Sequence, residues 1–313
     1  MKDKSTKNLR KSMGRGSVEH ETHVYEREGE VMTLANKNVV TISPTTTIKE
    51  AAKTMVREKF RRLPVTDPGS GKLLGILTAM DILSFLGGGD KFNLMEIKHH
   101  DNFLSAINES VKKIMSLDVK YINHKDTINH TIDLMIDESI GAVPIVDDNN
   151  KVVGIVSERD FILSMAGVFT DELVQELMTS NLIITTPGTP VESATKIMVR
   201  NQFRRIPIVG KEFDGPGVED EHLVGLITST DILKFFGDSG LLKKLGTNSG
   251  IDVLNTKVSD FMVNDVITVE PLTRVGDLCE LLANHNIGGV PVVKNQELLG
   301  IITERDILKF INQ

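Results

Sequence analysis

The sequence has 313 residues and a formal net charge of −7, and 40% of its residues are hydrophobic. That length suits about two domains. Because no apolar run approaches the roughly 18 residues that a membrane span needs, we expect a cytoplasmic protein with no membrane partner. The acidic balance argues against broad binding to nucleic acid, and the single cysteine, Cys279, excludes an intramolecular disulfide and a Cys-based zinc site.

The chain starts with a basic segment. Its first 16 residues carry six Lys or Arg against one acidic residue and show no apolar periodicity. We therefore predict a disordered tail over residues 1–30. A targeting peptide is the alternative, but the apolar stretch and the Arg-rich amphipathic helix typical of such peptides are absent.

A short pattern recurs four times and predicts four repeats. Each copy has a hydrophobic-Pro-hydrophobic step followed by a Gly-hydrophobic-hydrophobic-Ser/Thr-x-x-Asp segment: "GILTAMD", "GIVSERD", "GLITSTD" and "GIITERD". The four prolines are Pro64, Pro144, Pro207 and Pro291. We predict repeats over residues 31–88, 109–167, 168–238 and 256–313, with linkers over 89–108 and 239–255.

The repeats alternate in kind. Repeats 1 and 3 share "FRR" before the proline, whereas repeats 2 and 4 share Ile-Gly there and Glu-Arg-Asp after the Ser/Thr. The duplicated unit is therefore a pair of repeats.

Within a repeat, the pattern predicts the order strand, helix, strand, strand, helix, an α/β fold. In repeat 1, Ile48, Ala51, Ala52, Met55 and Val56 make one apolar helical stripe. "LPVTD" and "GKLLGILTA" predict two strands, and "MDILSFL" a helix ending at the glycines of 87–89. We expect the apolar face of this small sheet to be buried against the neighbouring repeat, so that pairs are the folding modules.

Two segments interrupt the regular pattern. Repeat 3 has a longer turn, "GKEFDGPGVEDEH", which we interpret as a solvated acidic loop, with a metal site as the alternative. The segment 87–110 carries His99 and His100, which we expect on an exposed linker face; contact with a phosphate or a partner is the alternative.

The Ser/Thr-x-x-Asp step stands where a strand passes into a helix, and it has two interpretations. The hydroxyl and the acid can cap the helix. Alternatively, the helix N-terminus can bind an anion while the carboxylate accepts hydrogen bonds from a ribose diol. The step alone does not decide between them.

Arginines recur beside these steps. Pairs precede the strand in repeats 1 and 3, and single arginines precede the Asp in repeats 2 and 4. Guanidinium groups bind phosphate oxygens in pairs of hydrogen bonds, so a set that recurs with the duplication favours an anion site over solvated surface arginines.

These motifs resemble the CBS domain, named after cystathionine beta-synthase. Four copies in two pairs are similar to the gamma subunit of AMP-activated protein kinase and to archaeal four-CBS proteins; "VMTLANKNVVTISPTTTIKEA", "FRRLPV" and "GGGDKFNL" carry the archaeal resemblance. It implies that repeats pair into Bateman modules, that two modules form a flat disc, and that adenine nucleotides lie in clefts between paired repeats.

The resemblance also implies roles for residues. The ribose would be bound by Asp81, Asp160, Asp231 and Asp306. The phosphates would be bound by Thr78, Ser157, Thr228, Thr303, Arg61, Arg62, Arg204, Arg205, Arg159 and Arg305. The adenine would be flanked by Ile76, Ile155, Leu226 and Ile301.

Two departures limit this transfer. Glycine or alanine occupies positions 141–142 and 288–289, where relatives often carry basic residues, so the four sites should differ. Lys120 and Tyr121 replace the Val/Ile-Thr pair of the other repeats, which weakens the adenine wall expected for repeat 2. We expect fewer than four occupied sites.

The leading functional expectation is a regulatory protein that binds AMP, ADP and ATP, senses cellular energy and signals to a separate protein, kinase-like or another enzyme. An S-adenosylmethionine-binding or nucleic-acid-binding CBS regulator is the alternative. No catalytic, Walker A or metalloprotease motif occurs, so we expect no enzyme activity, catalytic cofactor or metal. Self-association into a homo-oligomer is compatible with this class.

Overall fold

The computed structural model of the chain describes residues 28–89, 91, 99–100, 102–165, 171–210, 222–237 and 250–312. Over these residues one pattern recurs four times: a helix, two antiparallel strands and a second helix. The predicted α/β class and repeat architecture are confirmed. The tail up to residue 27 and positions 211–221 of the acidic loop lie outside the described residues.

Repeat 1 shows how the sequence produces this unit. Helix α1 (Ile48–Glu58) begins at a capping box, in which the Thr47 hydroxyl and the Glu50 carboxylate each accept a backbone N–H of the other residue. The predicted apolar stripe is buried, except for half-buried Val56. The helix ends at Lys59, whose φ of 58° is left-handed, and the chain turns into β1 (Arg62–Thr66).

Strand β2 (Leu73–Thr78) pairs antiparallel with β1, and Pro64 lies opposite Ile76. Helix α2 (Ala79–Leu83) then continues into the π-helical turn η2 (Ser84–Gly88). Gly87 has a φ of 124°, a value that favours glycine, so the helix ends where the glycines predicted its end.

The other repeats have the same elements. They are α4 (Ile128–Asp137), β4 (Ala142–Val146), β5 (Val152–Ser157) and α5 (Glu158–Met165) in repeat 2; α7 (Val191–Asn201), β6 (Arg205–Gly210), β7 (His222–Thr228) and α8 (Ser229–Gly237) in repeat 3; and α11 (Val275–His285), β8 (Gly289–Lys294), β9 (Glu297–Thr303) and α12 (Glu304–Ile311) in repeat 4. Shorter helices are η1 (Glu30–Thr33), α3 (Phe103–Ile107), η5 (Val111–Lys113), α6 (Val174–Leu177), α10 (Gly250–Leu254) and η6 (Val258–Asp260).

The predicted first strand is reduced to a single parallel bridge in three repeats, for example between Ile42 and Val65. In repeat 2 it is β3 (Ile122–Asn123), because His124 donates its backbone N–H to Val146. Repeats 1, 3 and 4 have proline at the position of His124, and proline has no N–H to donate.

The repeats of a pair exchange chain segments. The segment before α1 lies on the last strand of repeat 2 through a bridge between Asn36 and Ile155, and Ser116 of repeat 2 lies on Ile76 of repeat 1. The bridges Thr179–Ile301 and Leu226–Val263 do the same for repeats 3 and 4. Repeats 1 and 2 therefore form one module, and repeats 3 and 4 the other.

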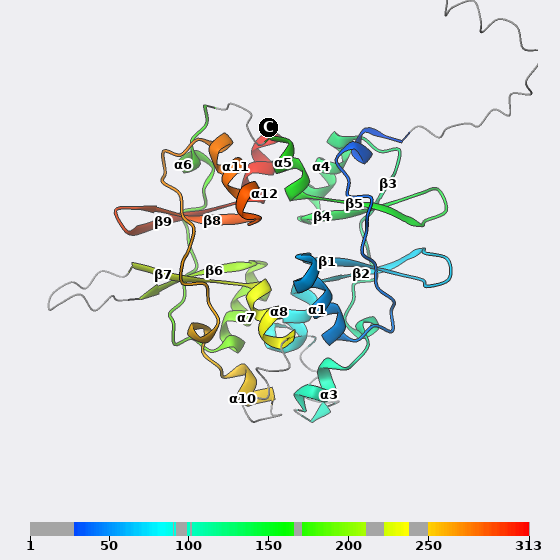
Figure 1. The fold of residues 1–313 in the computed structure, drawn as a ribbon, viewed down its shortest axis with the longest axis horizontal. Helices are drawn as coiled ribbons and strands as arrows, with labels where there is room; N and C mark the ends of the chain where they lie inside the picture. Colours follow the sequence, from blue (N-terminus) through cyan, green and yellow to red (C-terminus); the bar gives the residue numbers. More distant parts are fainter. Residues whose placement is uncertain are drawn as a thin grey trace, which may run out of the picture.

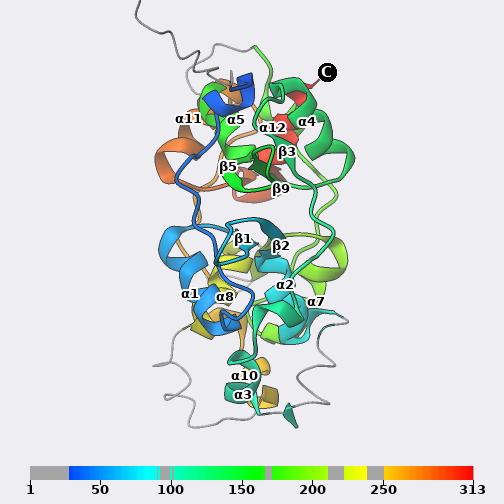
Figure 2. The same cartoon turned by 90° about the vertical axis from the view of Figure 1, so that its right-hand side faces the viewer.

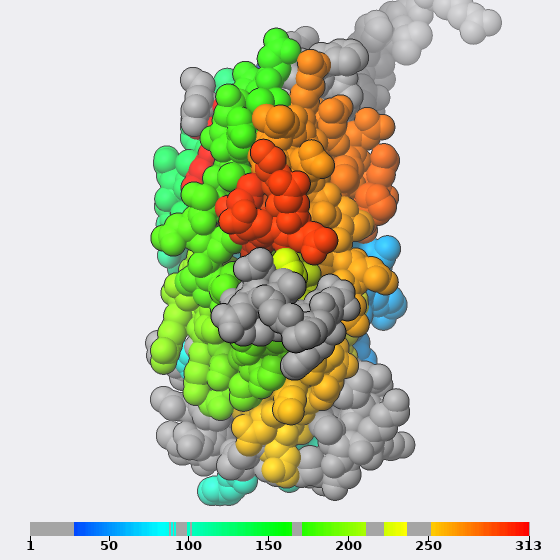
Figure 3. All heavy atoms as spheres, turned by 90° about the vertical axis from the view of Figure 1, so that its left-hand side faces the viewer, coloured from blue at the N-terminus to red at the C-terminus, as the bar shows by residue number. Residues whose placement is uncertain are grey.

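The two modules lie side by side, with the sheets of each pair facing one another (Figure 1). The view turned by 90° shows two tiers: repeats 2 and 4 above, repeats 1 and 3 below, with α3 and α10 at the lower end (Figure 2). On the outer face of the second module, the β8–β9 hairpin lies above the chain of repeat 3 (Figure 3).

The hydrophobic clusters cross the boundary between modules. The largest joins α1 and α2 of repeat 1 to α7 and α8 of repeat 3, and it includes Met55, Phe85, Met198 and Phe236. In the upper tier, Ile162 of repeat 2 packs in the cluster of repeat 4, and Leu308 of repeat 4 packs in that of repeat 2. The sequence predicts that the apolar face of each small sheet is buried against the other repeat of its pair. Instead, the helices extend the hydrophobic core across the boundary between the two pairs.

Candidate functional site

The four Ser/Thr-x-x-Asp steps are helix caps. In each, one carboxylate oxygen, Oδ2, accepts the backbone N–H of the Ser/Thr at 2.7–3.1 Å and its hydroxyl at 2.6–2.7 Å. In repeats 1 and 3 the hydroxyl also accepts the backbone N–H of the Asp, at 3.2 and 3.3 Å, which confirms the capping interpretation there. The hydroxyls of Thr78, Ser157, Thr228 and Thr303 thus give their hydrogen to the Asp, and each must turn to donate to a phosphate.

The second oxygen, Oδ1, distinguishes the four acids. Asp81 Oδ1 lies 2.6 Å from Lys91 Nζ, and Lys91 also donates to the Ile114 carbonyl. Asp231 Oδ1 lies 3.5 Å from Lys234, whose side chain is 58% exposed. Burial raises the pKa of Asp160 and of Asp306, and no ion pair with either appears among the described residues.

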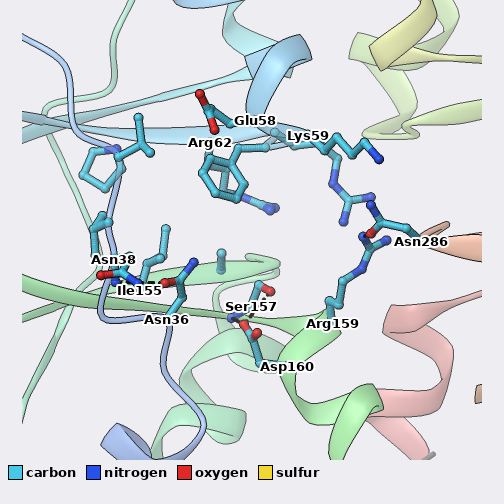
Figure 4. A pocket seen from close by; sticks show the side chains of 16 residues that line it. Asn36, Asn38, Glu58, Lys59, Arg62, Ile155, Ser157, Arg159, Asp160 and Asn286 are labelled. Atoms are coloured by element: carbon cyan, nitrogen blue, oxygen red, sulfur yellow. Dashed lines mark hydrogen bonds between the residues drawn. The ribbon is translucent and has the colours of Figure 1, made fainter. Parts of the chain in front are cut away.

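A cavity of about 250 Å³ lies between repeats 1 and 2 and contains Asp160. Figure 4 shows Asn36, Asn38 and Ile155 at one end, Ser157 and Asp160 in the middle, and Arg159 with Asn286 at the other end. Arg61, Arg62 and Lys59 of repeat 1 also line it. Amide and apolar groups, a carboxylate and guanidinium groups therefore follow one another along the cavity.

A second cavity of about 420 Å³ contains Asp231, between repeats 3 and 4. Leu226, Val266 and Ile267 line its apolar part, and Arg204 and Arg205 its basic part. Four residues line both cavities: Lys59, Arg61, Arg159 and Asn286. The two cavities, in different modules, thus meet at the same basic groups.

Six arginines converge between the modules around two buried carboxylates. Glu304 lies 3.0 Å from Arg61 and 2.8 Å from Arg159. Glu158 lies 2.8 Å from Arg204 and 2.7 Å from Arg305. Each glutamate thus joins repeats of different modules, and the two groups are related by the duplication of the pair.

The charges shift one another's pKa values. Burial alone would raise the pKa of Glu158, but Arg204, Arg62 and Arg305 outweigh it and hold the pKa at about 2. Burial, followed by the repulsion of Arg204, lowers the pKa of both Arg62 and Arg205 to about 9. The cluster therefore holds more positive charge than its carboxylates compensate.

The glycines of repeats 2 and 4 make room for this cluster. A Cβ on Gly141 would lie 2.6 Å from Glu158 Oε2 and 2.7 Å from Arg62 Nη2. A Cβ on Gly288 would lie 2.7 Å from Glu304 Oε2. The Ile-Gly and Glu-Arg-Asp signatures therefore occur together because the glycine leaves room for the buried glutamate. The same contact accounts for the glycines at positions 141 and 288, where relatives often carry basic residues.

The predicted phosphate and adenine residues are distributed unequally. Arg61, Arg62, Arg159, Arg204 and Arg205 line the cavities, as do Ile155 and Leu226. Arg305 lies in the cluster, while Ile76 and Ile301 lie against Ser116 and Thr179.

The adenine wall expected for repeat 2 needs a correction. Because the repeats exchange segments, Val39 and Val40 of repeat 1 line the Asp160 cavity. Lys120 corresponds to Val40 and follows Ser116, which lies on Ile76. The replacement of the Val/Ile-Thr pair therefore concerns the cleft of Asp81.

Sequence reasoning missed Glu158, Glu304, Lys91, Asn36 and Asn286. The two glutamates could have been found, because they repeat with the pair and precede the Arg. The expectation of an exposed His99 was wrong: its side chain is 11% exposed and lies 3.3 Å from Glu109. His100, by contrast, is exposed.

The four repeats thus form two pairs, with a cavity between the repeats of each pair. The chain belongs to the CBS-domain family, which matches residues 29–88, 111–167, 174–238 and 258–313. In the part of the chain that the structure describes, no helix is both long and apolar enough to cross a membrane.

Known relatives agree with this assignment. Protein MJ1225 of Methanocaldococcus jannaschii is 38% identical, and the match covers 90% of this chain and 98% of the relative. Its crystal structure, described as that of a proposed archaeal homologue of γ-AMPK, aligns with a TM-score of 0.82 over 90% of this chain and 99% of the other. The human 5′-AMP-activated protein kinase subunit gamma-3 is 26% identical over 63% of this chain and 40% of its own length.

Proposed function

We propose that this protein is a regulatory adenine-nucleotide-binding protein that holds AMP, ADP or ATP in the clefts of Asp160 and Asp231. The order of groups along the Asp160 cavity carries the proposal. The asparagines and Ile155 suit a base, and the arginines suit phosphates. The Oδ1 of Asp160, which accepts no hydrogen bond from the described residues, suits a ribose diol. The similarity to an AMP-activated kinase subunit supports the same ligand class.

The four clefts differ in this proposal. Asp160 and Asp231 line cavities and have an oxygen available, so their clefts are the principal sites. Asp306 would be a weaker third site. Lys91 occupies the oxygen of Asp81 that a ribose would use, so we expect the Asp81 cleft to remain empty.

Binding would be read as a change in how the modules pack. The three nucleotides share adenosine and differ in phosphate charge, and the arginines at both cavities also tie the modules together through Glu158 and Glu304. A ligand shifts such packing only by its difference in affinity for the two arrangements. In energy sensing, a separate partner protein would respond to this change in packing. The nucleotide would be released chemically unchanged.

Calorimetric titration with AMP, ADP and ATP tests this function, with S-adenosylmethionine as the control. We expect two or three nucleotides per chain, one fewer after Asp160→Ala, and no binding of S-adenosylmethionine, because arginines repel its sulfonium. Release of altered nucleotide, or binding of S-adenosylmethionine alone, would contradict the proposal. Absence of heat and of a thermal shift with every nucleotide would leave the Ser/Thr-x-x-Asp steps as caps only.

A further inference from the structure

Two buried glutamates have no part in the proposed nucleotide contacts. Glu158 and Glu304 stand at the first positions of α5 and α12, and their side chains are 1% and 2% exposed. A buried carboxylate loses its hydration, so it persists where several cations compensate it. Each of these has two arginines within 3.0 Å.

Their positions relative to the cavities differ. Glu304 holds Arg61 and Arg159, and both of these arginines line both cavities. Glu158 holds Arg204, which lines the Asp231 cavity, and Arg305, and it also attracts Arg62, which lines the Asp160 cavity. A change of charge at either glutamate should therefore reach both cavities, at Glu304 through Arg61 and Arg159 and at Glu158 through Arg204 and Arg62.

The cluster is compensated only in part. The side chain of Arg62 forms no hydrogen bond or ion pair within the described residues, and the buried Nη1 of Arg204 has no hydrogen-bond partner there. Six guanidinium groups face two carboxylates, so further anionic charge is attracted. However, the two carboxylates already accept hydrogen bonds from the arginines, and a longer phosphate chain would need the same donors.

We propose that Glu304 and Glu158 determine phosphate specificity: they are fixed internal anions that limit how much ligand charge the arginines accept. The inference rests on the proposed nucleotide function. AMP places one phosphate group at the arginines and ATP three, and the repulsion from a fixed carboxylate grows with ligand charge. The glutamates thus disfavour ATP relative to AMP, which keeps the two in competition at one site.

The test uses two full-length backgrounds that isolate the cavities. Asp231→Ala with Asp306→Ala leaves the Asp160 cavity, and Asp160→Ala with Asp306→Ala leaves the Asp231 cavity. Glu304→Gln keeps the shape of the side chain and removes its charge. Titration with AMP and with ATP gives the ratio of their affinities in each background.

We expect Glu304→Gln to raise the ratio of ATP affinity to AMP affinity about tenfold in both backgrounds. Glu158→Gln should also raise it in both backgrounds, through Arg204 at the Asp231 cavity and through Arg62 at the Asp160 cavity. Glu304→Asp keeps the charge and serves as the matched control, with a ratio within about twofold of the parent. A thermal unfolding curve establishes that each variant is folded, and if Glu304→Gln does not fold, Glu158→Gln tests the same rule at both cavities.

The outcomes separate this inference from the proposed function. If the parent chains bind nucleotide but the neutral variants leave the ratio unchanged, the specificity role is wrong and the binding function stands. If Glu304→Asp changes the ratio as much as Glu304→Gln, geometry and not charge is responsible, and the inference is overturned. If the parent chains bind no nucleotide, the proposed function itself fails.

Discussion

The clefts of Asp81 and Asp231 carry the same motif but are not equivalent. Both acids belong to repeats with Phe-Arg-Arg before the strand, and both cap a helix through Oδ2. Asp81 gives its other oxygen to Lys91 at 2.6 Å, whereas Lys234 stands 3.5 Å from Asp231 and is largely exposed. Lys91 lies outside the repeated motif, so we expect a residue of the linker to decide whether this copy of the motif binds a ligand.

The largest expected effect separates the two acids directly. Asp231→Ala should remove one nucleotide from the stoichiometry, because two charge-assisted hydrogen bonds to ribose contribute roughly 3–6 kcal/mol. Asp81→Ala should leave the stoichiometry unchanged. Calorimetric titration with AMP measures both, and loss of a nucleotide in Asp81→Ala would break the comparison.

The second-largest effect is expected at acid pH, on the stability of the folded protein. Protonation of Glu158 breaks its ion pair with Arg204 on the basic side of the Asp231 cleft. The folded protein lowers the pKa of Glu158 from 4.5 to about 2, so its stabilisation is complete above pH 4.5 and is lost as the pH falls towards 2. We expect this group to account for about 3 kcal/mol of unfolding free energy across that window. Denaturant unfolding of Glu158→Gln should lack this part of the pH dependence.

Opening the Asp81 cleft sharpens the comparison further. Lys91→Met removes the ammonium group but keeps a long side chain, and we expect one more nucleotide per chain than in the parent protein. The free protein should lose about 1 kcal/mol, because a partly buried ion pair is broken. Titration and thermal unfolding measure the two effects; an unchanged stoichiometry would show that Lys91 is not what closes the cleft.

The smallest effect is expected at the matching lysine. Lys234 is exposed and its distance to Asp231 is long, so Lys234→Met should change stability by less than about 0.5 kcal/mol and add no site. The same titration as for Lys91→Met serves as the comparison. A gain of a nucleotide here would mean that any loss of positive charge, and not release of Asp81, opens a site.

Much of this architecture is predictable from local patterns. The apolar stripe of α1, the Pro64 step and the glycines after α2 each act within a few residues, so the sequence alone indicates them. The first strand was over-predicted, since Pro44 lacks the N–H that His124 supplies in repeat 2. The core was assigned to the wrong interface, because periodicity shows that a face is apolar but not what covers it.

The site was predictable in its residue types and less so in its grouping. The recurrence of Asp and Arg indicated an anion site, and five of the six arginines line the two cavities. That Glu304 meets Arg61, 243 positions earlier in the chain, depends on the packing of the two modules. The adenine wall of repeat 2 was assigned to the wrong cleft, because the exchange of segments within a pair cannot be inferred from the sequence of one repeat.

That exchange also bears on how the chain arose. Asn36 lies on a strand of repeat 2, and Ser116 on a strand of repeat 1. A gene that gained or lost a single repeat would therefore leave two half-built clefts instead of one fewer complete cleft. Copying a whole pair preserves every shared edge, and the pairwise alternation of Arg-Arg and Ile-Gly along this chain is the trace that such a duplication would leave.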